Sequence, residues 1–358
     1  MLGITYQRKA FKISLKKEVI KIKAAKYEGK EDIRLIDIPK PHPQKDEVLV
    51  RVQYAGICGS DLELYKTGFL PYKVVLGHEI MGYVTEVGPD VKQWENGDRV
   101  TIFPIISCNH CHFCQIGQSN LCIYEDSIGL GQDGGFAEYV LAKQDQLYKI
   151  PEGIPDKHGT VFDQIATTPL ALRESNFIPE SHTAILGLGT MGQFFLQYLK
   201  VAGAKTITVV EKNPYRLNIA KKFSPDLALN KLTLAKIKRL PNRDFGGVDF
   251  VFECTGYQTV VDAALSIVKK GGTVVQIGIW DKPIEINLFK YVWHQIRIQG
   301  IWSYTRADFE YAIDLVAKKI IDPEPIVTKI IPLDDIVEEG FKAAIDPETK
   351  DIKILVEP

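Results

Sequence analysis

A glycine-rich loop between an apolar strand pattern and a helical pattern constrains the fold of this chain most strongly. The loop has the form G-x-G-x-x-G after the apolar run TAIL, and the helical pattern runs from Met191 to Ala202. Its residues are Gly187, Leu188, Gly189, Thr190, Met191 and Gly192. The first glycine permits a tight turn, the second lets the backbone approach a pyrophosphate, and the third lets the helix pack on the strand. The loop predicts a dinucleotide site at a helix N-terminus; a glycine turn without a ligand is the alternative.

The patterns on either side of this loop predict two domains, as is common for 358 residues. Beyond about residue 165, strand patterns (TAILG, TITVVE, VDFVFE, GTVVQIG) alternate with helical ones, which is typical of a doubly wound parallel sheet. Earlier, short strand patterns separated by proline and glycine predict a small β-barrel or sandwich. These cover residues 20–27, 47–52, 82–87, 99–103 and 137–141. A helical pattern at 308–318 and a final KILVEP could complete either domain.

An acid at the end of the second strand pattern indicates which dinucleotide is bound. Glu211 follows TITVV, nineteen residues after Gly192. A carboxylate there accepts hydrogen bonds from the adenosine ribose and repels a 2′-phosphate, which favours NAD over NADP. Lys212 and Arg216 weaken this preference, because either could neutralise a phosphate. We count Arg216 among the cofactor-binding residues.

Four of the six cysteines lie close together and predict a structural zinc site. They are Cys108, Cys111, Cys114 and Cys122. Four thiolates can surround one tetrahedral Zn²⁺ at about 2.3 Å each and leave no open position. Buried thiols or two disulfides are the alternatives, both disfavoured in a cytosolic chain. A nucleic-acid-binding zinc ribbon is also disfavoured, because no Lys or Arg lies between Ile105 and Asp126. We expect His110 and His112 to be exposed.

A second candidate metal site joins Cys58, in GICGSD, with His78 and Glu79, in GHE. A lone cysteine or histidine is more often structural. One thiolate, one imidazole and one carboxylate, however, can hold zinc and leave a fourth position for substrate or water. The pairing of these motifs with a downstream acid therefore predicts a catalytic zinc ion.

Charge and composition argue against several other classes of protein. The net charge of −1 gives no global attraction to nucleic acid or to an anionic membrane. The chain has no run of about eighteen apolar residues, so no transmembrane helix is expected. Its basic N-terminal segment is interrupted by lysines and lacks the apolar stretch of a signal peptide, so we expect a cytoplasmic protein.

Taken together, these motifs resemble the zinc-containing medium-chain alcohol and polyol dehydrogenases, in the branch of the sorbitol and threonine dehydrogenases. The resemblance rests on GICGSD, GHE and its following glycines, the cysteine lobe, GDRV, GGFAEY and GLGTMG, which occur in family order. It implies a GroES-like β-barrel catalytic domain over 21–168 and 308–358, with the structural zinc lobe at 105–125. It also implies a Rossmann NAD-binding domain over 169–307. Residues 1–20 would form an extension, and relatives suggest a homodimer or homotetramer.

The resemblance also implies roles around the catalytic zinc ion. Cys58 and His78 are ligands, and Glu79 is a close ligand or a carboxylate just behind the ligands. Asp163 occupies the remaining ligand position, where sorbitol-like members carry Glu and threonine dehydrogenases carry Asp. Gln164 replaces the proline that usually follows in both. A helix N-cap is the alternative role for Asp163.

The mechanism implied by the resemblance is hydride transfer from an alcohol carbon to NAD⁺. Zinc acts as a Lewis acid on the substrate hydroxyl, and Ser60 relays the departing proton. Many relatives carry a histidine for the final proton step at the position of Glu63. We therefore expect Glu63 or water to serve there.

Three functions follow as alternatives. The aromatic side chains of 301–304 suit stacking on a sugar and favour a polyol, cyclitol or sugar substrate, whereas Asp163 favours L-threonine 3-dehydrogenase. A nucleotide-binding protein without turnover is the alternative of another class, because fold alone does not fix function. A zinc-free quinone reductase is disfavoured by the retained Cys58 and His78. We expect Cys254 to be a buried apolar residue.

Overall fold

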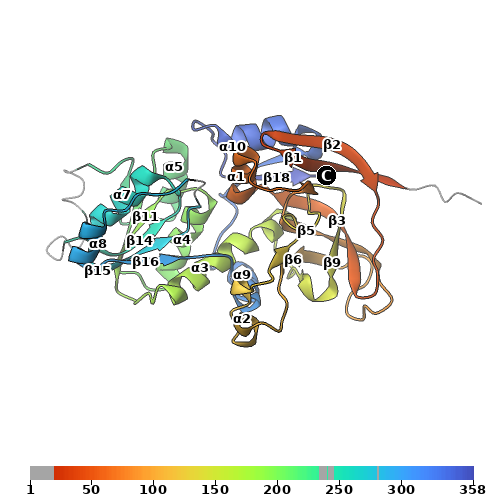
Figure 1. Cartoon of the computed structure of the whole chain (residues 1–358), viewed down its shortest axis with the longest axis horizontal. Helices are drawn as coiled ribbons and strands as arrows, with labels where there is room; N and C mark the ends of the chain where they lie inside the picture. The colour runs from red at the N-terminus through yellow and green to blue at the C-terminus, as the bar shows by residue number, and fades with distance from the viewer. Residues whose placement is uncertain (1–19, 234–239, 241–245, 280–281) are drawn as a thin grey trace, which may run out of the picture.

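The computed structural model describes residues 20–233, 240, 246–279 and 282–358. The expected N-terminal extension, 1–20, thus lies outside the described residues except for Ile20. Figure 1 shows two lobes side by side: a strand-rich lobe built from the early and final parts of the chain, and a lobe of helices around a sheet from its middle. No described helix combines the length and apolar character needed to cross a bilayer.

Mostly antiparallel strands build the strand-rich lobe. One sheet has the order β2-β1-β4, and a larger one runs β10-β6-β5-β3-β18-β17, with β9 also paired to β3. Their bounds are β1 Lys21–Gly29, β2 Asp32–Pro39, β3 Glu47–Gly56, β4 Val74–Val75, β5 Glu79–Val87, β6 Arg99–Ile102, β9 Tyr139–Lys143, β10 Leu147–Lys149, β17 Val327–Pro332 and β18 Lys353–Glu357. The five predicted early strands are confirmed within a few residues, and their inward side chains share one apolar core.

A six-stranded parallel sheet forms the other lobe, in the order β13-β12-β11-β14-β15-β16. The bounds are β11 His182–Leu186, β12 Thr206–Val210, β13 Leu227–Leu229, β14 Val248–Glu253, β15 Val268–Gln276 and β16 Arg297–Gly300. This order is that of the dinucleotide-binding doubly wound fold. The predicted fold class is therefore confirmed for this lobe.

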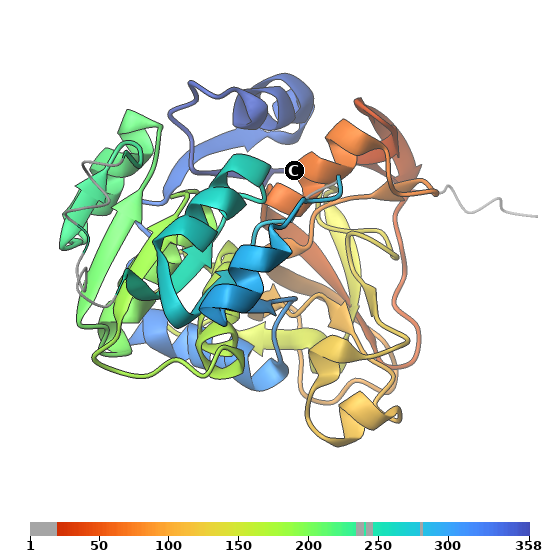
Figure 2. The same ribbon diagram turned by 60° about the vertical axis from the view of Figure 1, so that its left-hand side comes forward.

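Helices cover both faces of the parallel sheet, as Figures 1 and 2 show. In β11, Ile185 packs into one apolar cluster with α4, whereas Ala184 and Leu186 pack into another with α7. A strand buried on both faces explains the continuous apolar run TAIL. The described α-helices of the two lobes together, apart from α2 of the cysteine lobe, are α1 Gly59–Thr67, α3 Phe162–Glu174, α4 Thr190–Val201, α5 Pro214–Lys222, α7 Gln258–Ile267, α8 Leu288–His294, α9 Arg306–Ala317 and α10 Ala343–Ile345, with a π-helix at Ile336–Lys342.

The cysteine lobe and the C-terminal segment complete the strand-rich part. The lobe contains the short strands β7 Ile105–Ile106 and β8 Asp126–Ser127 around helix α2, His112–Gln115. After α9, which packs on α3, the chain returns, and β18 inserts between β3 and β17. Leu355 of β18 pairs with Gly56, two residues before Cys58. The last strand therefore lies beside the candidate site. The domain boundaries at 168/169 and 307/308 stay a prediction.

Candidate active site

The four cysteines of the lobe converge on one point. All four sulfurs lie within 4.8 Å of one another; Cys111 and Cys114 Sγ are 3.5 Å apart, and Cys108 and Cys114 Sγ are 3.9 Å apart. Sulfurs bound at about 2.3 Å to one tetrahedral Zn²⁺ stand about 3.8 Å apart, whereas a disulfide needs about 2.05 Å. Backbone N–H groups of Cys108, Cys111 and Tyr124 also point at these sulfurs. The cluster fits a structural zinc ion.

Protonation of the lobe thiols also points to a cation. A backbone hydrogen bond from Cys114 lowers the pKa of the Cys111 thiol to about 6, whereas burial and neighbouring sulfurs raise the pKa of Cys114 to about 12. Four thiolates this close repel one another, and a divalent cation removes that conflict. His110 and His112 are exposed, as predicted.

Cys58, His78 and Glu79 form the second cluster, with one ligand atom from each within 4.8 Å of the others. Cys58 is the N-cap of α1, where the positive end of the helix dipole favours a thiolate. His78 and Glu79 lie at the turn into β5, and Gly77 supplies the left-handed backbone of this turn with φ 93°. The sequence-predicted thiolate, imidazole and carboxylate are thus brought together.

Asp61, for which the sequence analysis predicted no role, lies against two members of this cluster. It is completely buried on α1. Its Oδ2 accepts the N–H of Cys58 at 2.9 Å, and its Oδ1 lies 3.7 Å from Nδ1 of His78. A carboxylate behind Nδ1 leaves Nε2 for a metal ion. Burial lowers the pKa of His78, but Asp61 and Cys58 outweigh it and hold the pKa well above its usual value. An acid three residues after the helix-capping Cys58 is the sequence signal for this role.

The carboxylate of Glu79 is held from behind. Nζ of Lys353 donates to its two oxygens at 2.7 and 2.6 Å and to the carbonyl of Ile57 at 2.9 Å. The amide of Gln164 donates to the same carboxylate. Glu79 and Lys353 are each only 2% exposed, and Gly56 leaves the necessary space, since a Cβ there would lie 1.9 Å from Oε2 of Glu79. Lys353 and the unusual Gln164 thus fix Glu79.

Asp163 lies outside the three-residue metal cluster. It is the second residue of α3, whose N-cap is Val161, so the N-cap alternative is wrong. Its Oδ2 accepts the hydroxyl of Tyr304 at 2.6 Å. Burial and the negative charge of Asp163 raise the pKa of Tyr304 well above its usual value, so the phenol stays a donor. Direct zinc ligation by Asp163 stays a prediction.

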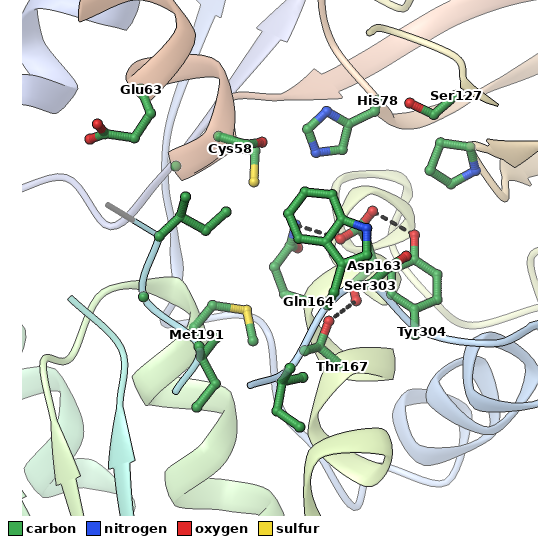
Figure 3. A pocket seen from close by; sticks show the side chains of 18 of the residues that line it. Cys58, Glu63, His78, Ser127, Asp163, Gln164, Thr167, Met191, Ser303 and Tyr304 are labelled. Atoms are coloured by element: carbon green, nitrogen blue, oxygen red, sulfur yellow. Dashed lines mark hydrogen bonds between the residues drawn. The ribbon is translucent and has the colours of Figure 1, made fainter. Parts of the chain in front are cut away.

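A cavity of 300 Å³ opens in front of Cys58 and His78. In Figure 3 these two side chains lie at one end of the cavity, and Met191 of the glycine loop lies across from them. Residues 301–304 line the cavity, as predicted, with Trp302 51% exposed. Cys254 packs against the apolar cluster beneath α4, as predicted for an apolar residue, but it is only partly buried and also lines the cavity. The cavity bridges the two lobes.

The glycine loop borders a second cleft, of 650 Å³. Gly187 has φ 92°, and a Cβ on Gly192 would lie 1.9 Å from the carbonyl oxygen of Gly187. A Cβ on Gly189 would meet nothing within 4 Å. The turn, the close packing and the open approach predicted for the three glycines are therefore present. Helix α4 begins at Thr190, so its first N–H groups are placed to donate to a phosphate of a dinucleotide.

Glu211 lies in the same cleft, directly after β12. Its oxygens accept the N–H groups of Leu188, at 2.7 Å, and Asn213, at 2.8 Å. These bonds fix the carboxylate against the glycine loop. Lys212 and Arg216 line the cleft as well. The charged residues of the described lining are two carboxylates, Glu211 and Asp346, and four cations, Lys66, Lys212, Arg216 and Lys231.

Comparisons with known proteins agree with this geometry. Residues 44–152 match the family described as "Alcohol dehydrogenase GroES-like domain", and residues 190–318 match "Zinc-binding dehydrogenase". The (R,R)-butanediol dehydrogenase of Bacillus subtilis (strain 168) is 34% identical over 351 residues, which cover 94% of this chain and 100% of the relative. An L-threonine 3-dehydrogenase of Shewanella frigidimarina is 29% identical and covers 89% of this chain and 95% of the relative.

Solved structures extend the likeness to the whole fold. The crystal structure of 2R,3R-butanediol dehydrogenase from Bacillus subtilis matches with a TM-score of 0.84 at 33% identity, covering 94% of this chain and 99% of the other. The fold and the two metal clusters define a zinc-containing, nicotinamide-dependent oxidoreductase. The chain belongs to the zinc-binding medium-chain dehydrogenase family. Its barrel is accordingly GroES-like, as predicted.

We expect the purified protein to carry one zinc ion in each of its two clusters. Cys58→Ser should remove the ion at the cavity. Cys111→Ser should remove the lobe ion and also lower the melting temperature, because the lobe loses its cross-link. Metal analysis by mass spectrometry after dialysis, paired with thermal denaturation, tests both. Cys254→Ser is the matched control and should keep both ions; unchanged zinc in the first two variants would contradict the assignment.

Lys353→Met should destabilise the fold, because it leaves the buried Glu79 carboxylate unpaired. The expected loss is about 3–5 kcal/mol in the free energy of unfolding. The double variant Lys353→Met/Glu79→Gln should regain most of it, since a neutral amide needs no counter-ion. Denaturant unfolding of the four proteins of this cycle measures the coupling. Simple addition of the two single losses would refute the pairing.

Proposed function

We propose that the protein transfers a hydride between a secondary alcohol of the polyol, cyclitol or sugar type and NAD(H). One observation carries the proposal: a single cavity is lined by Cys58 and His78 at one end and by Met191 of the glycine loop at the other. A substrate hydroxyl at the first end and a nicotinamide ring at the second would share one confined space. Such positioning supplies much of the rate of a two-reactant step.

The charge of this cavity favours an uncharged substrate. Its described lining contains the carboxylates Glu63, Glu125 and Asp163 and neither Lys nor Arg. A phosphorylated polyol, or the carboxylate of L-threonine, would meet these carboxylates without a Lys or Arg to offset them. Relatives named butanediol and sorbitol dehydrogenase therefore suggest the substrate better than those named D-arabitol-phosphate or L-threonine 3-dehydrogenase.

Two alternative functions also have support. L-threonine 3-dehydrogenase is the second candidate, because one such relative is 29% identical and because the family resemblance implies Asp in threonine dehydrogenases at the position of Asp163. A nucleotide-binding protein without turnover is the alternative of another class. The clustering of Cys58, His78 and Glu79, with the first two lining the cavity, argues against it.

NAD is the coenzyme that Glu211 favours, because its carboxylate would repel a 2′-phosphate. Lys212 and Arg216 act in the opposite direction. Relatives use either form: a protein described as a zinc-binding dehydrogenase from Sinorhizobium meliloti 1021, 31% identical with a TM-score of 0.85, was crystallised with NADP. A relative from Escherichia coli CFT073, 26% identical, was crystallised with NADH.

In the proposed mechanism, Cys58 and His78 would hold a zinc ion, and the chemistry that this ion would supply is Lewis acidity toward the substrate hydroxyl. Ser60 and Glu63 both line the cavity and lie three residues apart on α1, so they share one face of this helix. Ser60 accepts the proton of the hydroxyl and passes it toward Glu63 and solvent. Lys66 donates to the Glu63 carboxylate at 2.8 Å and keeps it in place.

Assembly into a homodimer or homotetramer is part of the proposal. Strand β16 is an edge of the parallel sheet, and the neighbouring helix α8 exposes Phe289, Val292 and Trp293. Exposed apolar side chains beside a sheet edge are typical of a surface that a second copy covers.

Absorbance at 340 nm tests the function. We expect reduction of NAD⁺, and weaker reduction of NADP⁺, with sorbitol or butane-2,3-diol, and loss of this activity after zinc chelation. Sugar phosphates and L-threonine should react poorly, because the described lining of the cavity provides no Lys or Arg to pair with their additional negative charge. Faster turnover of L-threonine than of any neutral alcohol would overturn the proposed substrate class, and turnover that survives complete removal of zinc would overturn the mechanism.

A further inference from the structure

One carboxylate of the cavity has no role in the mechanism described above. Of the three acids that line the described cavity, Glu63 accepts from Lys66 at 2.8 Å and Asp163 accepts from Tyr304 at 2.6 Å. Glu125 has no cation or phenol as its partner among the described residues. It is nevertheless half-buried, at the point where the cysteine lobe borders the cavity.

Glu125 lies against a segment that the cysteine lobe holds in place. The indole Nε1 of Trp302 donates to Oε1 of Glu125 at 3.4 Å, and the buried side chain of Asn120 donates to the backbone oxygen of Trp302 at 3.1 Å. The next residue, Ser303, has φ 60°, a left-handed conformation that is costly for a residue other than glycine. The lobe therefore fixes Trp302 and Glu125 together at the cavity wall.

We propose that Glu125 determines substrate specificity by accepting a hydrogen bond from a substrate hydroxyl away from the reacting carbon. This proposal rests on the proposed function and narrows it to polyhydroxylated substrates. The indole contact at 3.4 Å is longer than a usual N–H···O bond of about 2.7–3.2 Å, so the carboxylate has capacity for a better donor. A hydroxyl donating to a carboxylate makes a short, strong bond. The apolar face of Trp302 lies beside it to pack on the C–H groups of a polyol.

The solvation of Glu125 supports this role. Burial raises the pKa of its carboxyl group, because the charged form has lost part of its contact with water. A hydrogen bond from a substrate hydroxyl replaces the lost hydrogen bonds with water. An alcohol with a single hydroxyl, which is used at the metal site, leaves the carboxylate without this hydrogen bond. Sites with an unmatched polar group discriminate strongly against such substrates.

The test compares substrates with and without additional hydroxyl groups. We expect Glu125→Ala to lower the ratio of kcat/KM for sorbitol to that for butan-2-ol by about tenfold, mainly through the KM of sorbitol. Glu125→Gln should lower it less, because the amide oxygen still accepts. Glu152→Gln, at an exposed glutamate, is the matched control and should leave the ratio unchanged. A ratio in Glu125→Ala equal to that of the parent protein overturns the proposal.

A binding measurement separates this proposal from the proposed function. Titration of sorbitol against tryptophan fluorescence, with Trp302→Phe as the blank, needs no turnover. Weaker sorbitol binding by Glu125→Ala supports the role of Glu125 even if the parent protein oxidises no alcohol, in which case the proposed function alone fails. Equal affinity for sorbitol in the two proteins overturns the role of Glu125 whatever the turnover.

Discussion

The buried ion pair between Lys353 and Glu79 is the interaction on which the rest of the site depends. It joins residues 274 positions apart, one on the last strand and the other beside His78. A buried pair of this kind adds little net stability compared with an apolar pair, but breaking it leaves a buried charge uncompensated. The metal cluster can therefore form only when β18 has inserted beside β3. The same lysine donates to the carbonyl of Ile57, just before Cys58, so one ammonium group holds the backbone beside Cys58 and the side chain of Glu79.

Two helix N-termini face the cleft between the lobes, close to the pair of Lys353 and Glu79, and determine which charges this cleft favours. Cys58 caps α1, and Gly189 caps α4. Both residues line one small cleft of 240 Å³ that lies between the lobes. Each helix directs free N–H groups and the positive end of its dipole toward negative charge: a thiolate in one case, a pyrophosphate in the other. The metal site and the dinucleotide site thus lie next to each other, and each is formed at a helix N-terminus that favours negative charge.

Motifs of nearby residues were predictable, because their spacing carries the chemistry. The four-cysteine cluster and the glycine loop follow from short spacings and from strand and helix periodicity, whereas the pairing of Cys58 with His78 follows from the GICGSD and GHE motifs and the family resemblance. Contacts between distant segments were not, as the partners Lys353 and Gln164 of Glu79 illustrate. The N-cap alternative for Asp163 was wrong because α3 already begins at Phe162 with Val161 as its N-cap, and because the carboxylate of Asp163 accepts a hydrogen bond from the phenol of Tyr304, 141 residues away. Short strands such as β13 carry too few residues for a periodic pattern.

The central claim is that one cavity brings an alcohol carbon and a nicotinamide ring together for direct hydride transfer. Butane-2,3-diol deuterated at carbons 2 and 3, incubated with NAD⁺ and the zinc-loaded protein, tests it most directly. Mass spectrometry of the reduced coenzyme gives the answer. The account predicts one deuterium in every NADH molecule formed. NADH without deuterium, or no NADH from this or any other neutral alcohol, would contradict it.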